Sequence, residues 1–189
     1  MKKMSIVFGA VLSLFFIACE GPAGPPGYDG FDGLDGLDGL DGRDGQERGT
    51  VVDITGDFVA DDYSLFYEFI QDDIEVFETD IVLVYLLWDQ TEDGNGDPVD
   101  IWRLLPQTRL LDQGILQYNY DFTFFDVNIF LEADFDLNTL PTGDTDAQTF
   151  RIAIIPAEML QGSRLDRSNV RAVMNTMGIT EKEVRKSTL

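Results

Sequence analysis

The run IVLVYLLW at residues 81–88 decides the fold of this chain. It is rich in β-branched and aromatic residues and too short for an ordinary helix, so it predicts a strand buried on both faces. We expect this strand to end at Asp89, because the segment EDGNGDP at 92–98 has the composition of a turn. A second apolar run at 101–105 then completes a β-hairpin over residues 81–105.

Two further stretches have strand patterns. Between residues 123 and 131, two rows of residues alternate, so that one row should face inward. A turn over 138–146 leads into the apolar run at 150–155, which Pro156 ends. One row is Phe125, Val127, Ile129 and Leu131, and the other is Phe124, Asp126, Asn128 and Phe130.

Shorter strand candidates bring the total to seven or eight. They lie near residues 50–59, 63–70, 74–79 and 115–120, and turns separate them at intervals typical of antiparallel strands. We therefore predict a mainly β fold, an antiparallel β-sandwich over residues 50–163. Jelly-roll and immunoglobulin-like connectivities are both open at this point.

The C-terminal segment, residues 164–189, predicts short helices. Four apolar residues recur with helical spacing, and Gly178 follows them as a stop signal. Thr180 and Glu183 have the spacing of a capping box, so a second helical turn or two is expected to run to about Lys186. Such helices would cover an end or edge of the sandwich, and the alternative is a helix that binds a partner. The apolar stripe consists of Val170, Val173, Met174 and Met177.

The composition excludes several classes of chemistry. The 189 residues include one cysteine and no histidine. The chain therefore cannot form an internal disulfide, a zinc site with Cys or His ligands, or a His-dependent nucleophilic site. Carboxylates remain, but no spacing marks a catalytic pair. We predict a non-enzymatic protein, with a carboxylate-based glycosidase as the less favoured alternative.

The chain is strongly acidic, with a formal net charge of −22 and a pI near 4.1. Loss of two lysines with the signal segment would bring the charge to −24. A field of this sign repels nucleic acid, so no nucleic-acid partner is expected. Basic residues gather in the last 26 positions, where they form a solvated face or lie against an acidic surface. They are Arg164, Arg167, Arg171, Lys182, Arg185 and Lys186.

The N-terminus has the pattern of a secretory signal. Two lysines form a positive region, an apolar run follows at 6–18, and Cys19 comes directly after the small Ala18. The run has 13 residues, fewer than the roughly 20 that cross a bilayer as a helix. Residues 1–18 are therefore predicted to be a signal peptide.

The tetrapeptide Phe16-Ile17-Ala18-Cys19 resembles the lipobox of bacterial lipoproteins, a family that favours Leu where this chain has Phe16. The resemblance implies that the thiol of Cys19 is diacylglycerated, that the signal is cut before it, and that the new N-terminus is acylated. Several acyl chains anchor a protein stably to a membrane. The alternative is an ordinary signal peptide cut nearby, which leaves a free thiol.

Residues 21–47 consist of nine unbroken Gly-x-x triplets. A collagen triple helix requires glycine at every third position, because only a hydrogen atom fits at its axis. The segment resembles collagen-like stretches of bacterial surface proteins, and residues 19–49 are predicted to be the lipid anchor and a stalk. A triple helix would make the protein a homotrimer. The alternative is a flexible acidic spacer.

Acidic residues occur at two places where Ca²⁺ could bind. In the stalk, six aspartates stand at the third position of successive triplets. In the turn, Asp93, Asn95 and Asp97 alternate like the first ligands of some calcium loops, but Pro98 and Leu104 stand where such loops have Gly and Glu. An acidic hairpin tip is the alternative there. The stalk residues are Asp29, Asp32, Asp35, Asp38, Asp41 and Asp44.

Four strand aromatics allow two interpretations. If they are exposed, they would form a sugar-binding face, and with Ca²⁺ the domain would be a glycan-binding module. If they are buried, they fill the core, as strand aromatics more often do. The residues are Trp88, Trp102, Tyr118 and Tyr120.

The whole layout resembles the collagen-like lipoproteins of Gram-negative bacteria. The lipobox and the opening EGPAGPPG at residues 20–27 carry this resemblance. It implies a lipid-anchored position on the outer membrane, either periplasmic or at the cell surface. We predict a structural or interaction protein whose β domain is a head held out by the stalk, with a protein or a glycan as its ligand.

Overall fold

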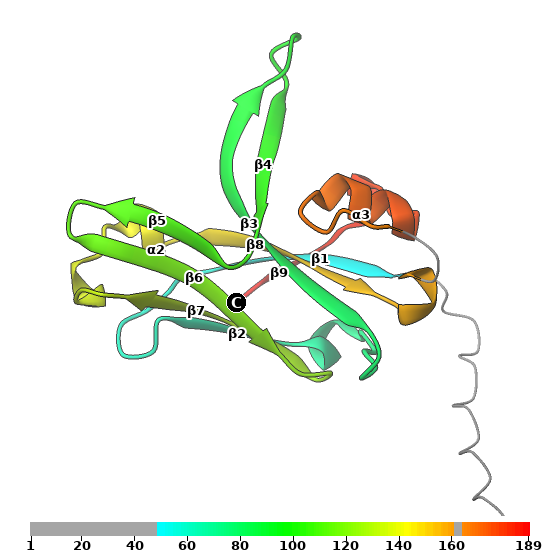
Figure 1. Ribbon diagram of the computed structural model, residues 1–189, viewed down its shortest axis with the longest axis horizontal. Helices are drawn as coiled ribbons and strands as arrows, with labels where there is room; N and C mark the ends of the chain where they lie inside the picture. The colour runs from blue at the N-terminus through cyan, green and yellow to red at the C-terminus, as the bar shows by residue number, and fades with distance from the viewer. Residues whose placement is uncertain (1–48, 161–163) are drawn as a thin grey trace, which may run out of the picture. The chain divides into compact units, whose positions relative to one another are not determined.

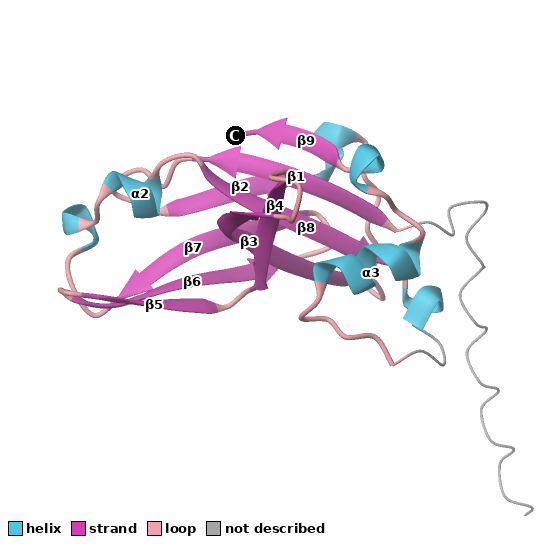
Figure 2. Ribbon diagram, turned by 90° about the horizontal axis from the view of Figure 1, so that it is seen from above, coloured by secondary structure: helices cyan, strands magenta, loops and turns pink. Residues whose placement is uncertain are grey.

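Two β-sheets, both largely antiparallel, make up most of the domain (Figures 1 and 2). The computed structural model describes residues 49–160 and 164–189. The predicted signal peptide, Cys19 and the stalk aspartates lie outside the described residues. The described residues belong to one compact unit. The prediction of a mainly β fold is confirmed, and the arrangement is consistent with a β-sandwich.

Sheet A has five strands in the order β4-β3-β8-β1-β9, and sheet B has four in the order β2-β7-β6-β5. Sheet A consists of β1 (Thr50–Gly56), β3 (Ile81–Glu92), β4 (Pro98–Leu104), β8 (Gln148–Ile155) and β9 (Arg185–Thr188). Sheet B consists of β2 (Ser64–Glu68), β5 (Gln107–Leu111), β6 (Gly114–Phe122) and β7 (Asp126–Ala133). The helices are α2 (Thr142–Thr145) and α3 (Val170–Met177), with short 3-10 turns η2 (Phe69–Asp72), η3 (Leu137–Thr139), η4 (Ala157–Leu160) and η5 (Glu181–Glu183).

The main hydrophobic core lies between the two sheets. Every second side chain of the central strands points into it, as the period of two requires. Phe58, from the loop after β1, packs edge-on against the rings of Tyr118 and Phe150, with centroid distances of 6.1 and 6.0 Å. The largest fully buried members of this core are Tyr67, Tyr118, Phe69, Phe150, Ile54, Leu116, Ile129 and Ile152.

Strand β3 is buried on both faces, as its sequence predicts. Val82, Val84 and Leu86 face the inter-sheet core, whereas Leu83 and Tyr85 face a second core on the other side of sheet A. The predicted end at Asp89 is wrong, because the strand runs on to Glu92. Beyond a register shift at Leu87–Asp89, pairing with β4 continues as a two-stranded ribbon that extends past both sheets (Figure 1). The predicted hairpin over residues 81–105 is confirmed.

Three other strand predictions need correction. The segment 74–79 has no strand, and β5, which was not expected, pairs with β6 as the edge of sheet B. In β7 the predicted alternation holds, with Val127, Ile129 and Leu131 as the buried row, but Phe125 precedes the strand and is 65% exposed. Phe125 does not follow the alternating pattern of the strand because the chain turns between β6 and β7 at residues 123–126.

Helix α3 matches the predicted amphipathic helix. The side chain of Asn169 accepts a hydrogen bond from the Ala172 amide at its start, and Gly178 ends it in the left-handed conformation, with φ of 66°. The helix covers the outer face of sheet A, where an end or edge was expected (Figure 2). This second core joins Val173, Met174 and Met177 to Val51, Leu83, Tyr85, Ala153 and Ile155.

The C-terminal residues form a strand where a helix was predicted. The capping box of Thr180 and Glu183 is present, but the helical turn stops at Glu183. Val184 is extended and buried, and β9 then pairs in parallel with β1 from Val52 to Thr55. The reason is tertiary, because the open edge of β1 offers unpaired backbone groups that a polar segment can satisfy.

Candidate functional site

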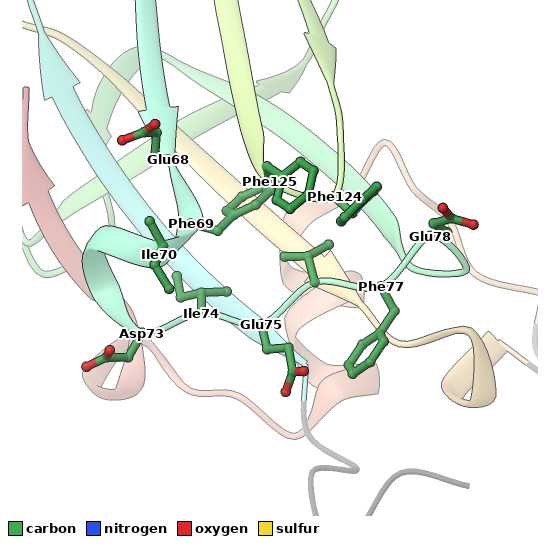
Figure 3. Close-up of a pocket in the computed structure, with 11 residues that line it drawn as sticks. Glu68, Phe69, Ile70, Asp73, Ile74, Glu75, Phe77, Glu78, Phe124 and Phe125 are labelled. Carbon is green, nitrogen blue, oxygen red and sulfur yellow. The ribbon is translucent and has the colours of Figure 1, made fainter. Parts of the chain in front are cut away.

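An apolar pocket of about 810 Å³ lies where β2 ends, β6 turns into β7, and the chain leads into β3. Figure 3 shows its side chains, with Phe69, Phe124 and Phe125 grouped together and the ring of Phe77 apart from them. Seven of the lining residues carry aromatic or aliphatic side chains, and they come from two parts of the chain. From the β2–β3 connection come Phe69, Ile70, Ile74, Val76 and Phe77, and from the β6–β7 turn come Phe124 and Phe125.

The floor of the pocket is fixed by the way the chain leaves β2. After Glu68 it forms the single turn η2, which Asp73 ends in the left-handed region with φ of 52°. The amide of Ile74 then donates to the carbonyl of Phe69 at 3.0 Å. Phe69, Ile74 and Val76 are buried. The floor therefore belongs to the main core and needs no ligand to hold it.

The β6–β7 turn supplies the aromatic wall. The Thr123 amide donates to the Asp126 carbonyl at 2.9 Å, and the Phe125 amide donates to Oγ1 of Thr123 at 3.0 Å. The amide of Phe69 donates to the carbonyl of Phe125 at 2.9 Å. This bond joins the β6–β7 turn to the floor of the pocket. The rings of Phe124 and Phe125 lie 3.9 Å apart between centroids. A closed turn thus presents two aromatic rings at a defined place.

Much of this apolar surface stays in contact with water. Ile70 is 74% exposed, Phe125 65%, Phe124 39% and Phe77 38%. Single exposed apolar residues are ordinary on a protein surface, but a contiguous group around a cavity is typical of a binding surface.

The rim of the pocket is acidic. Glu68, Asp73, Glu75 and Glu78 line it and are exposed, and no Lys or Arg is among the residues that line it. In Figure 3 the carboxylates of Glu68, Asp73 and Glu78 lie at the periphery, and all four lie apart from the rings of Phe124 and Phe125. The pocket therefore combines an apolar interior with a negative potential at its mouth.

Hydrogen bonds connect residues that are next in sequence to those lining the pocket. The hydroxyl of Tyr67 donates to Oδ2 of Asp72 at 2.6 Å, and the guanidinium of Arg185 donates to the Asp72 carbonyl. Burial, followed by the bond to Asp72, raises the pKa of Tyr67 well above its ordinary value. Arg185 belongs to the basic C-terminal group. One member of that group therefore lies against the acidic body of the domain, which is one of the two arrangements expected from the sequence.

In the hairpin loop at 93–97, the carboxylate of Asp93 accepts hydrogen bonds from the backbone of the loop itself. Oδ1 of Asp93 accepts hydrogen bonds from the amides of Asn95 and Asp97, at 2.7 and 3.0 Å. These bonds lower the pKa of Asp93. Over the described residues, no group of three or more Cys, Asp or Glu side chains is placed to hold a metal ion. Calcium binding by Asp93, Asn95 and Asp97 stays a prediction.

The four strand aromatics do not share one surface. Tyr118 is fully buried and donates to the Asp144 carbonyl at 2.9 Å, and the Tyr120 hydroxyl donates to the Val82 carbonyl at 3.3 Å. Trp88 packs against the inter-sheet core, whereas Trp102 packs on the α3 side of sheet A. Three of the four thus contact the inter-sheet core, and Trp102 contacts the second core.

An arginine guanidinium lies over the ring of each tryptophan. The guanidinium carbon of Arg103 lies 3.9 Å from the centre of the Trp88 ring, with that of Arg109 at 5.5 Å. Arg151 lies 4.4 Å from the Trp102 ring centre. Arg109 also forms an ion pair with the buried Asp144. Each ring thus has an arginine of the chain itself against its face.

Arg151 is the most completely enclosed charge of the domain. It donates to both oxygens of Asp53, at 2.7 and 2.9 Å, and to both oxygens of Glu181, at 2.8 and 2.9 Å. Desolvation lowers its pKa, but the bonds to Asp53 and Glu181 outweigh this, so the pKa is raised overall. Glu181 also borders a second, more polar cavity of about 720 Å³ between β4 and α3. The Glu181 carboxylate already accepts hydrogen bonds from Arg151, which does not favour a role as a free catalytic acid.

Comparison with protein-family models, with curated proteins and with solved structures gave no match. Among the residues that the structure describes, no helix is both long and apolar enough to cross a membrane. The functional argument therefore depends on the geometry of the domain.

The sequence alone did not reveal the pocket. The doublet Phe124-Phe125 interrupts the strict alternation of β7, and it stands between Thr123 and Asp126, which close the turn. An aromatic pair inside a turn is the signal that could have been used, because turns are normally solvated. Acidic and apolar residues alternate from Asp73 to Val76, a pattern typical of a strand, but the structure has no strand there.

Proposed function

We propose that this chain is a lipoprotein of the outer membrane, anchored through Cys19, whose collagen-like stalk presents the β domain as a binding head. Its role is structural or interactive and not enzymatic. The observation that supports binding is the exposed apolar pocket around Phe124 and Phe125. An isolated domain gains nothing from keeping such a group of side chains in water, because their burial is favourable.

The proposed head is a β-sandwich of jelly-roll type. In an immunoglobulin-like domain the first two strands are neighbours in one sheet. Here β1 pairs with β8 in sheet A, whereas β2 pairs with β7 in sheet B. These nested pairings of early with late strands favour the jelly-roll alternative.

Site-specific cross-linking in cells tests the binding function. A photo-crosslinkable phenylalanine analogue replaces Phe125 in one variant and Val59 in a control, a residue that is 61% exposed but does not line the pocket. We expect a discrete adduct from position 125 and none from position 59. Equal yields at the two positions, or no adduct at either, would contradict a binding role for the pocket.

The anchoring part of the proposal has its own test. Metabolic labelling with palmitate should mark the wild-type protein, and Cys19→Ser should abolish the label and release the protein from the membrane fraction. A labelled Cys19→Ser variant would show that the anchor lies elsewhere.

A further inference from the structure

We propose that the pocket binds one class of partner, an apolar peptide segment flanked by Lys or Arg in another envelope protein. The inference deepens the proposed function, since it assumes that the pocket is a binding surface and adds the chemistry of the ligand. The apolar interior of the pocket binds the apolar part of the peptide, and the carboxylates of the rim attract its flanking Lys or Arg side chains.

The size of the pocket fits a short segment. A cavity of about 810 Å³ lies within the range of about 300–1,000 Å³ that is typical of sites for small ligands. One or two aromatic or aliphatic side chains can fill such a space. They would contact the rings of Phe124 and Phe125, which the β6–β7 turn holds in place.

The rim then sets the sign of the flanking charge. Four exposed carboxylates surround the pocket and no basic residue lines it. The net charge of the whole chain, −22, has the same sign. A low-dielectric cavity with walls of one sign focuses the field and attracts groups of the opposite charge. Lysine or arginine beside the apolar anchor would meet these carboxylates, whereas Asp or Glu would be repelled.

The same electrostatic argument disfavours the nearest other occupants. A second copy of the domain docking through the same pocket would place eight rim carboxylates together, two sets of Glu68, Asp73, Glu75 and Glu78. The Gly-x-x segment has an acidic residue at the end of most triplets, so it is repelled as well. Anionic lipid headgroups carry the same unfavourable sign.

Two matched peptides test the inference. Both have a Phe-Leu-Phe centre, and the centre is flanked by lysines in one peptide and by glutamates in the other. Binding to the mature chain, residues 19–189 with Cys19→Ser, is followed by fluorescence anisotropy. We expect the lysine peptide to bind at least about tenfold more tightly at low salt, and the ratio to shrink in about 0.5 M salt.

Variants of the chain assign this preference to the rim. The triple change Glu68→Gln, Glu75→Gln and Glu78→Gln should reduce the affinity for the lysine peptide about five- to tenfold, at about twofold for each exposed charge. Glu92→Gln, an exposed position on the hairpin, is the control and should leave it unchanged. Phe125→Ser should abolish binding of both peptides. An unaltered melting temperature shows that each variant is folded.

The outcomes separate the two proposals. Equal binding of the two peptides, or a lysine preference that survives the triple change, overturns the inference about ligand charge. If the adduct at position 125 still forms in cells, the proposed function stands without it. Undiminished binding of the lysine peptide by Phe125→Ser places its site elsewhere and overturns the inference as well.

Discussion

Arg151 and the pocket around Phe125 both bring charges and aromatic rings together, but only the first arrangement is closed. Arg151 has two carboxylates, the Trp102 ring and the sulfur of Met174 around it, and its own side chain is buried. At the pocket, four carboxylates and three phenylalanine rings remain exposed. The difference indicates which surface is structural, because groups satisfied inside the chain stabilise the fold and groups left open are available to a partner.

The largest effect is expected from removing the cover over Arg151. Deleting residues 165–189 exposes the outer core of sheet A and removes four buried apolar side chains, Val173, Met174, Met177 and Val184. At about 1.5–3 kcal/mol for each side chain, the loss equals the whole stability of an ordinary domain. We expect no cooperative thermal transition in this variant. A melting temperature equal to that of the full chain would show that the segment has no structural role.

A smaller but still large loss should follow from Arg151→Met. The substitution leaves Asp53 largely buried without its cation, although Glu181, with a side chain 70% exposed, can turn to solvent. Breaking a buried ion pair from one side costs about 3–5 kcal/mol. Urea denaturation should show this loss.

Arg103→Met is the matched control for Arg151→Met. It removes a cation from the Trp88 ring, but Arg103 is exposed, so the expected loss is only about 0.5–1 kcal/mol. If the two variants have equal stability, Arg151 is not the structural charge that its surroundings indicate.

Buried tyrosines on the two sides should respond alike to alkaline pH. Tyr67 faces the inter-sheet core, and Tyr85, whose hydroxyl donates to the Arg167 carbonyl at 2.6 Å, faces the second core. Burial is the main reason that the pKa of each phenol is raised. The unfolded chain releases these protons near its ordinary pKa of about 10, whereas the folded chain keeps them. The stabilisation is therefore complete below pH 10 and is lost as pH rises above it.

Tyr85→Phe tests that pH dependence. At neutral pH it should cost about 0.5–1.5 kcal/mol for the lost hydrogen bond, and above pH 10 it should flatten the fall in the free energy of unfolding. The measurement is urea denaturation from about pH 8 to 11. An unchanged slope would mean that the Tyr85 phenol ionises in the folded state as readily as in the unfolded one.

The sequence predicted the features that local patterns encode. Residues 81–88 are apolar on both rows, and both faces of β3 are buried. The stripe of α3 and its stop at Gly178 depend on neighbours within one helix, so they too could be predicted.

Features that depend on distant contacts could not be predicted in this way. The polar segment 185–188 becomes a strand only because the edge of β1 is open beside it. Asp53 and Arg151 are 98 residues apart, and nothing in their spacing indicates that β1 and β8 are neighbours. The pocket likewise requires the turn at Phe125 to meet the loop after β2.

The smallest expected effect on stability is at the pocket itself, and it sharpens the comparison most. Phe125→Ser removes an exposed ring and should change the free energy of unfolding by no more than about 0.5 kcal/mol. Phe150→Ala, which truncates a fully buried ring, should cost about 3–5 kcal/mol. If Phe125→Ser destabilises the domain nearly as much as Phe150→Ala, the exposed rings are part of the core and the pocket is structural. If Phe125→Ser keeps the stability of the domain but loses peptide binding, Phe150 belongs to the structural core and Phe125 to the binding surface.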